Sequence, residues 1–258
     1  MSSKYFAFEN RAVAFLDILG FTRLVKKAEN GNDNMQQLKS LIDVIESHIL
    51  YENNLTSPNL PEEAKPKYLF VSDSIILSAP LVYQNFDGLV SVSVKCIEIC
   101  HKLLEIGALV RGAINVGKVL HQESNVFGSG YIDAYLAEQT ARNPKIVLTE
   151  SAIDHIQTGT QFGHPIKDLR LWIKDGKSTI VDSLHIEYMR HSKNQYKWQS
   201  DQQDMYEIYR GHINTNLEDS YPGDPAREKW EWMAAFFNQT ISRHSIAAES
   251  FSNFPFKE

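Results

Sequence analysis

Apolar segments follow one another along the first 150 residues in an order that few folds accommodate. Runs of apolar residues, and apolar residues at helical spacing, indicate strand, helix, strand, strand, helix, strand, then a further helix and strand. The predicted strands are 12–16, 68–71, 74–78, 109–116 and 145–149, and the predicted helices are 34–51, 86–106 and 130–141. A βαββαβ order is typical of the ferredoxin-like arrangement. Because its first and third strands are neighbours, the end of the first strand should lie beside the tip of the hairpin 68–78.

The pattern changes after residue 150. A small hairpin is predicted around Asp175-Gly176, with strands at 169–173 and 178–182. One helix is predicted around 205–213, and another begins at Pro225 with Asp224 as its cap. The buried stripe of that last helix should consist of Trp230, Met233, Phe237 and Ile241. We therefore predict an α+β fold, with a core domain over 10–150 and a mostly helical C-terminal extension over 151–258 that packs on the core.

Composition narrows the classes of function. The chain has 258 residues, 43% of them hydrophobic, and a net charge of −6, so it offers no basic surface for nucleic acid. No apolar run is long enough to span a bilayer, and the first ten residues do not resemble a secretory signal, so we expect a cytoplasmic protein without a membrane partner. Cys96 and Cys100 are four residues apart on a predicted helix, and we interpret them as plain buried residues.

Two aspartates are the strongest candidates for chemistry. Asp17 ends the first apolar strand, and Asp73 lies at the tip of the predicted hairpin. If the fold is right, their carboxylates meet at one edge of the sheet, where they would repel each other unless a divalent cation lay between them. Carboxylate oxygens suit magnesium or manganese, and the Ile18 carbonyl is a natural extra ligand because the chain turns there. Two such ions could activate a hydroxyl and bind a triphosphate.

These residues lie in segments that resemble the class III adenylate and guanylate cyclases. The segment from Phe15 to Thr22 (FLDILGFT) is similar to the family's first metal motif, and Ser72-Asp73-Ser74 to its second, which normally reads Gly-Asp-Ser. The segment from Arg111 to Gly117 (RGAINVG) resembles a later strand of the family, and Phe127-Gly128 resembles the Trp-Gly that opens its last motif. The resemblance covers about residues 10 to 150 with the order preserved.

The resemblance implies roles for particular residues. Asp17 and Asp73 would hold two metal ions, with the Ile18 carbonyl as a further ligand. Gly20, Phe21 and Thr22 would offer backbone amides to the triphosphate at the start of a helix. The family forms head-to-tail homodimers, with each site built from both subunits, and the C-terminal extension could carry part of that contact.

The sequence departs from the family at several positions. The family's last motif carries an Asn and, four residues on, an Arg that stabilise the transition state, but 128–142 holds no such pair and has Asp133, Tyr135 and Glu138 instead. Arg111 or Arg142 could supply the missing charge. Where adenylate cyclases have Lys and guanylate cyclases have Glu to select the base, this sequence has Leu69, and the neighbouring Tyr68 could hydrogen-bond a smaller base.

An atypical base pocket in a soluble chain of this size resembles the pyrimidine cyclases of the bacterial Pycsar antiphage system. That resemblance implies UTP as substrate, 3′,5′-cyclic UMP and pyrophosphate as products, manganese preference, and signalling to a separate effector protein. Three alternatives stay open: a cytidylate or adenylate cyclase, a catalytically dead nucleotide-binding regulator, and a relative of the diguanylate cyclases. The last would need a Gly-Gly-Asp/Glu-Glu-Phe type hairpin tip, which Ser72-Asp73-Ser74 is not.

Overall fold

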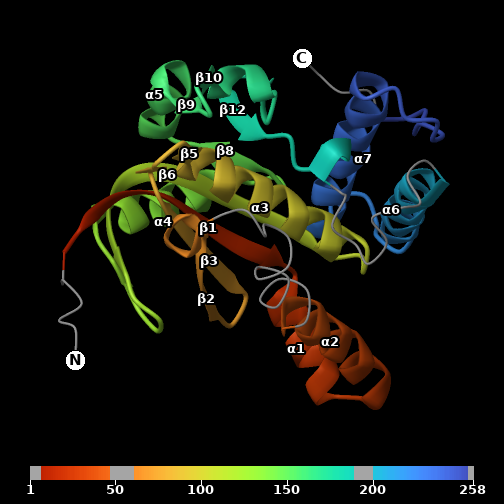
Figure 1. The fold of residues 1–258 in the computed structure, drawn as a ribbon. Coiled ribbons are helices and arrows are strands. Elements are labelled where there is room, and N and C mark those ends of the chain that lie inside the picture. The colour runs from red at the N-terminus through yellow and green to blue at the C-terminus, as the bar shows by residue number, and fades with distance from the viewer. Residues whose placement is uncertain (1–6, 47–60, 189–199, 255–258) are drawn as a thin grey trace.

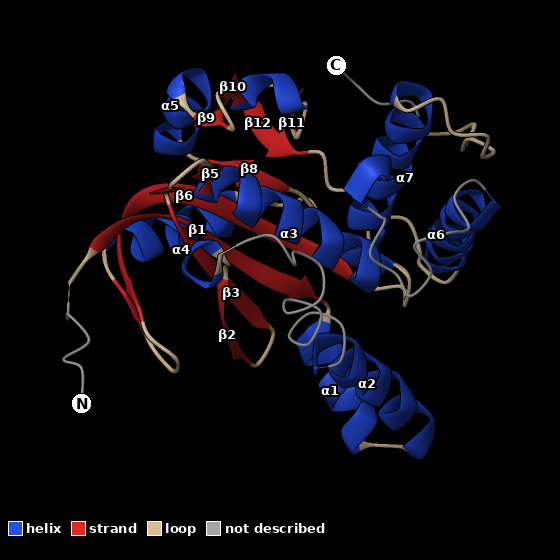
Figure 2. Ribbon diagram, in the orientation of Figure 1, coloured by secondary structure: helices blue, strands red, loops and turns tan. Residues whose placement is uncertain are grey.

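A computed structural model describes residues 7–46, 61–188 and 200–254 of the chain. It has a mixed α+β fold built on one large twisted sheet, with helices on both faces (Figures 1 and 2). The described residues contain no helix that is long and apolar enough to cross a membrane.

The order of strands across the sheet is β11-β12-β8-β6-β1-β3-β2, and the short strand β7 pairs with β6. The bounds are β1 Glu9–Leu19, β2 Lys67–Val71, β3 Ser74–Pro80, β6 Leu109–His121, β7 Val126–Phe127, β8 Ile146–Leu148, β11 Trp172–Asp175 and β12 Ser178–Val181. The four strands β6, β1, β3 and β2 lie in this order and are antiparallel to one another, which is the ferredoxin-like arrangement, whereas β6 pairs with β8 in parallel. The predicted neighbourhood of the first and third strands, β1 and β3, is therefore confirmed.

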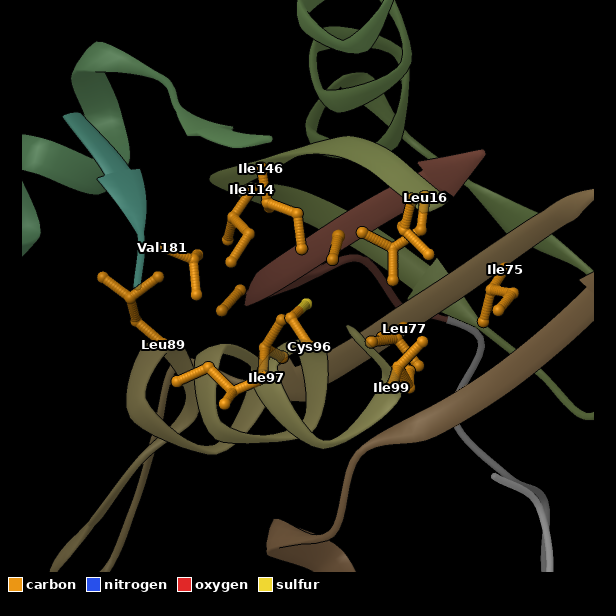
Figure 3. Packing of buried hydrophobic residues seen from close by; sticks show 14 of the residues in the cluster. Leu16, Ile75, Leu77, Leu89, Cys96, Ile97, Ile99, Ile114, Ile146 and Val181 are labelled. Carbon is orange, nitrogen blue, oxygen red and sulfur yellow. The ribbon is translucent and has the colours of Figure 1, made fainter. Parts of the chain in front are cut away.

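The two faces of the sheet follow the alternation of side chains along β1. Leu16 and Ile18 point into the main core under α3 (Gly88–Leu104), together with Leu77 of β3 and Cys96 of α3 (Figure 3). Phe15 points to the opposite face, which α4 (Ser129–Thr140) covers. Because side chains alternate along a strand, Asp17 belongs to the α4 face.

Close backbone contact lets α4 lie on β6. A Cβ atom at Gly117 would come within 2.8 Å of the Gly130 Cα atom, so a side chain at either position would push the helix away from the strand. Gly117 and Gly130 therefore set the distance between α4 and the sheet.

Within the described residues, two α-helices lie between β1 and β2 in the sequence. Helix α1 (Phe21–Glu29) and helix α2 (Asn32–Val44) form a helical pair that projects from one end of the sheet (Figure 1). The predicted helix 34–51 overlaps α2, but its last residues lie outside the described part of the chain. The predicted loop 52–66 also lies largely outside it, apart from a short 3₁₀ turn, Glu62–Ala64.

The C-terminal half is continuous with the core sheet. Strands β11 and β12 form the predicted hairpin, starting three residues later than expected, and β12 pairs with β8 through Ile180 and Val147. The predicted boundary at residue 150 is therefore not a break in the sheet, because the hairpin extends it. Helix α5 (Glu150–Thr158) and two short ribbons, β4 (Val82–Tyr83) with β5 (Phe86–Asp87) and β9 (Thr160–Gln161) with β10 (His164–Pro165), complete this side.

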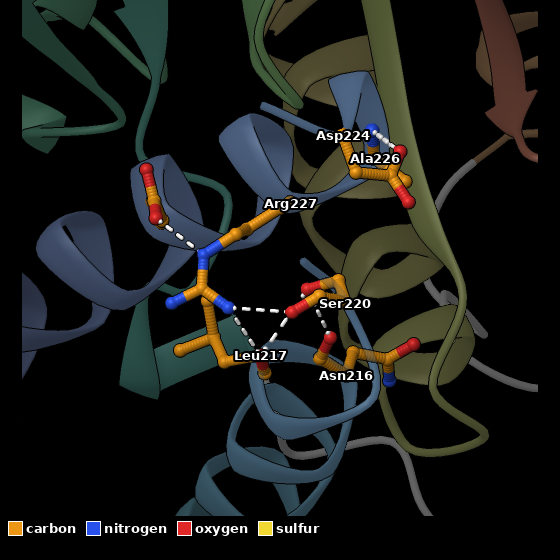
Figure 4. A network of polar contacts seen from close by, with 7 residues as sticks. Asn216, Leu217, Ser220, Asp224, Ala226 and Arg227 are labelled. Carbon is orange, nitrogen blue, oxygen red and sulfur yellow. Dashed lines mark hydrogen bonds and ion pairs between the residues drawn. The ribbon is translucent and has the colours of Figure 1, made fainter. Parts of the chain in front are cut away.

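Helices α6 (Ser200–Glu218) and α7 (Pro225–Arg243) form the mostly helical extension. The predicted cap of α7 is present, since the Ala226 amide donates to Asp224 Oδ1 at 2.8 Å. All four predicted stripe residues of α7 are buried, in a second core with residues of α6 and of the sheet. The turn between the helices is held by Arg227, which donates to the carbonyls of Leu217 and Ser220 (Figure 4).

Candidate active site

The hairpin tip lies beside the end of the first strand, as the topology requires. Asp17 pairs with Ser74 in the register of β1 and β3, and the Ile18 amide donates to the Asp73 carbonyl at 2.9 Å. Asp73 occupies the turn between β2 and β3, where Ser72 has a left-handed backbone with φ of 58°. A glycine adopts this conformation at lower cost, which explains why the resembling motif normally has glycine there.

Arg111 faces Asp17 from the neighbouring strand. The two residues are partners in the register of β1 and β6, and both Nε and Nη2 of Arg111 lie 3.1 Å from Asp17 Oδ2. The same guanidinium contacts Glu138 of α4, whose Oε1 lies 2.6 Å from Arg111 Nε. It also donates from Nη1 to the Ala141 carbonyl at 3.3 Å. Arg111 thus joins the strand carboxylate to the end of α4.

Glu138 joins this cluster through Arg111, a contact that the sequence alone did not reveal. It lies in the segment where the family's Asn/Arg pair was expected, and its side chain is 4% exposed. No regular motif marks it, because a single acid in a helix usually faces solvent. The other two residues named there take different places: Asp133 is exposed, and the partly exposed ring of Tyr135 packs edge-on against Phe15 of β1, with ring centroids 5.2 Å apart.

Burial and mutual repulsion shape the charge of this cluster. Burial raises the pKa of Asp17; the guanidinium of Arg111 opposes this, and the charge of Asp73 adds to it. Burial likewise raises the pKa of Glu138, again against Arg111 and with help from Asp17 and Asp73. Three carboxylates and one guanidinium therefore leave the site with excess negative charge when all are ionised.

The donor types of this cluster suit a divalent cation, but its three carboxylates lie further apart than the one group of three donors in the described residues whose ligand atoms all lie within 4.8 Å of one another, which is Asp182, His185 and His244. The carboxylates of Asp17, Asp73 and Glu138 are hard oxygen ligands, and their excess charge is what a magnesium or manganese ion would neutralise. Arg111 engages Oδ2 of Asp17. Ile18 lies between Asp17 and the Asp73 backbone, so its carbonyl as a ligand remains a prediction consistent with its position.

The predicted phosphate-binding segment lies at the beginning of α1. Gly20 precedes the helix with φ of 84°, and a Cβ atom there would meet no atom within 4 Å, so the backbone conformation alone requires glycine. Phe21 and Thr22 form the first turn, which contains no acidic residue. Amides of a first turn have no partner within the helix, so they can bind an anion three residues beyond Asp17.

Tyr68 is not brought together with the carboxylates. Its side chain packs into the core under α3, and burial, with the charges of Glu98 and Cys96, raises its pKa well above the usual value. The prediction placed it in the base pocket, but side chains alternate along β2, so Tyr68 and Asp17 point to opposite faces of the sheet. Leu69 is the residue that points to the α4 face, where it packs near Phe15.

No family model matches the chain, and no curated protein matches it. Among solved structures, the adenylyl cyclase CyaB from P. aeruginosa is similar at 15% identity, over 67% of this chain and 92% of that one, with a TM-score of 0.44. The catalytic core of a rhodopsin-guanylyl cyclase with converted specificity, in complex with ATPαS, is similar at 15% identity over 70% and 98%, with a TM-score of 0.45. A class III adenylyl cyclase-like ATP-binding protein from Pseudomonas aeruginosa is similar at 9% identity over 89% and 46%, with a TM-score of 0.38.

Proposed function

We propose that this chain is a nucleotide cyclase that converts UTP into 3′,5′-cyclic UMP and pyrophosphate. The observation that carries the proposal is that Asp17 and Asp73 lie at the same end of the sheet, where the backbone amide of Ile18 donates to the Asp73 carbonyl and Asp17 pairs with Ser74. In the reaction, the ribose 3′-oxygen forms a bond to the α-phosphorus, the bond from that phosphorus to the β-bridging oxygen breaks, and the hydroxyl proton passes to solvent.

The chain's own residues would mainly position charge. Two manganese or magnesium ions, held by Asp17, Asp73 and the Ile18 carbonyl, would supply hydroxyl activation and neutralise the leaving pyrophosphate. The first-turn amides of Phe21 and Thr22 would hold phosphate oxygens. Arg111, shared between Asp17 and Glu138, would face the charge that develops on the phosphates.

An apolar base position supports a pyrimidine substrate. Leu69 points to the α4 face and offers no hydrogen bond to a purine edge, and neither a Lys nor a Glu stands there. Together with the resemblance to the Pycsar cyclases, this favours UTP. On the same basis we propose that the product is a second messenger for a separate effector in antiphage defence.

An exposed apolar surface supports a homodimer. Phe127 of β7 and Ile132, Tyr135 and Leu136 of α4 are 50%, 52%, 39% and 52% exposed. Three of them lie on α4, the helix that carries Glu138, so a second copy bound there would approach the carboxylate cluster. Burying such residues against a partner is more favourable than leaving them in water.

The deciding experiment is incubation of the purified protein with UTP, CTP, ATP or GTP and manganese, followed by product identification. We expect cyclic UMP and pyrophosphate from UTP. Asp17→Asn and Asp73→Asn should each reduce the rate at least about a hundredfold, because each removes a metal-binding charge. Their melting temperatures should be retained, since the substitutions also relieve carboxylate repulsion. Turnover of ATP alone, or near-normal rates in either variant, would contradict the proposal.

A catalytically dead nucleotide-binding regulator is the second candidate. The engagement of Asp17 by Arg111, and the absence of an Asn and an Arg four residues apart in 128–142, favour it. Such a protein would bind a triphosphate with manganese and release no pyrophosphate, so the same incubation distinguishes the two.

A further inference from the structure

The C-terminal helix α7 reaches the end of the sheet that carries the carboxylates. Leu19 lies two residues beyond Asp17, and Leu109 lies two residues before Arg111; the two leucines are partners in the β1–β6 register. Both pack into the second core, which Trp230 of α7 helps to form. Because residues two apart on a strand share a face, α7 borders the face on which Asp17 and Arg111 stand.

Lys229 is the residue of α7 that immediately precedes Trp230. It is half-buried, and within the described part of the chain it makes no hydrogen bond or ion pair. A partly buried ammonium group without a partner keeps donors available for a ligand. Its positive charge also acts on Asp17: burial raises the pKa of Asp17, and the charge of Lys229 opposes that rise.

The proposed substrate would need such a cation. A nucleoside triphosphate brings several negative charges to a site that already holds three carboxylates, and Arg111 is shared between two of these. Divalent ions neutralise only part of that total. Resting on the proposed function, we propose that Lys229 is a phosphate-binding residue, through which the C-terminal extension completes the nucleotide site.

The test has two parts: a binding assay that measures the affinity for phosphates without turnover, and steady-state kinetics that measure turnover of the substrate. Tripolyphosphate with manganese serves as the probe for binding, and UTP serves for steady-state kinetics. We expect Lys229→Ala to weaken tripolyphosphate binding about tenfold and to raise KM for UTP by a similar factor, because a charge-assisted contact is lost. Lys229→Arg should restore most of the affinity, and kcat should change less than KM.

Lys177→Ala is the matched control, because it removes an exposed lysine in the turn between β11 and β12. It should bind and turn over as the unmodified protein does. Wild-type affinity and KM in Lys229→Ala would overturn the inference while leaving a cyclase intact. Conversely, a protein that makes no cyclic product but loses tripolyphosphate affinity in Lys229→Ala would refute the proposed function and support the phosphate site. Failure of the unmodified protein to bind tripolyphosphate would refute the phosphate site.

Discussion

At the scale of single residues, Arg111 holds the candidate site together. It contacts Asp17 on its own sheet and Glu138 on the helix above, and both acids are at least four-fifths buried. Removing Arg111 would leave two buried carboxylates without their shared counter-charge, which costs more than the ion pairs themselves contribute. Stability and activity should therefore respond differently to substitutions here.

We expect Arg111→Ala to lower the free energy of unfolding by about 2 kcal/mol, because Glu138 loses its counter-charge. Adding Glu138→Gln in the same chain should restore most of that loss without restoring cyclase activity. Chemical denaturation and product assays on the two single variants and the double variant check this. If the double variant recovered turnover as well, Arg111 would be a structural residue only.

Two buried histidines give the second prediction at this scale. Burial lowers the pKa of His101 to about 4 against the upward pull of the His185 carbonyl, and burial lowers the pKa of His121 to about 4, with Arg11 and Lys67 adding to the effect. The unfolded chain would take up these protons near pH 6.5, whereas the folded protein would not. Stability should therefore fall as the pH drops from about 6.5 to about 4 and then level off, by up to about 3 kcal/mol for each histidine.

Denaturation at a series of pH values measures this slope. His121→Gln should reduce it, and His164→Gln should leave it unchanged because His164 is exposed on β10. A profile that is flat between pH 6.5 and 4.5 would contradict the burial of both rings as neutral groups.

At the scale of elements, a buried polar cluster attaches the end of α7 to the end of β12. Asp182, His185 and His244 bring a carboxylate and two imidazoles within 4.8 Å, a donor set that a transition metal can use. Both carboxylate oxygens are already engaged, however: Oδ1 lies 2.7 Å from Arg243 Nη1, and Oδ2 lies 2.9 Å from His244 Nε2. Although burial alone would raise the pKa of Asp182, these contacts lower it.

Asp182 should therefore hold the C-terminal end of α7 against the end of β12. We expect Asp182→Ala to lower the free energy of unfolding by about 3 kcal/mol, because Arg243 would be left unpaired beside a buried cavity. Asp219→Ala, at an exposed position near the end of α6, should change it by less than about 0.5 kcal/mol. Urea denaturation of both variants at pH 7 compares them, and equal stabilities would show that the contacts contribute nothing.

At the scale of the whole molecule, the order of the strands could be predicted from the sequence, but the contacts between particular side chains could not. The segment order fixed the convergence of Asp17 and Asp73, because hydrophobic period and strand order alone determine which ends meet. Tyr68 was expected to contact the base but faces the main core, because the short apolar run 68–71 does not reveal which of its residues faces which side of the sheet. The positions of Glu138 and Lys229 relative to the sheet depend on how α4 and α7 are rotated about their axes and on where they pack. No local sequence pattern determines either.

The assembly prediction also belongs to this scale. We expect Leu136→Glu to shift the protein from dimer to monomer and to reduce cyclase activity, because it places a charge in the exposed apolar surface of α4. Light scattering coupled to size-exclusion chromatography measures the mass, and Tyr221→Glu, a change in an exposed aromatic residue between α6 and α7, is the control. A monomer in the unmodified protein would refute the proposed dimer.

The pairing of β12 with β8 has a practical corollary for anyone who would shorten this protein. A truncation after residue 150 would strip hydrogen-bonding partners from β8 at Val147 and uncover apolar side chains such as Leu104 and Leu109. The edge of β8 would then be unpaired, next to leucines exposed to water, and such an edge is a template for aggregation. We therefore expect that residues 10–150 do not fold as a separate unit, and that a minimal fragment has to retain the hairpin and helices that follow them.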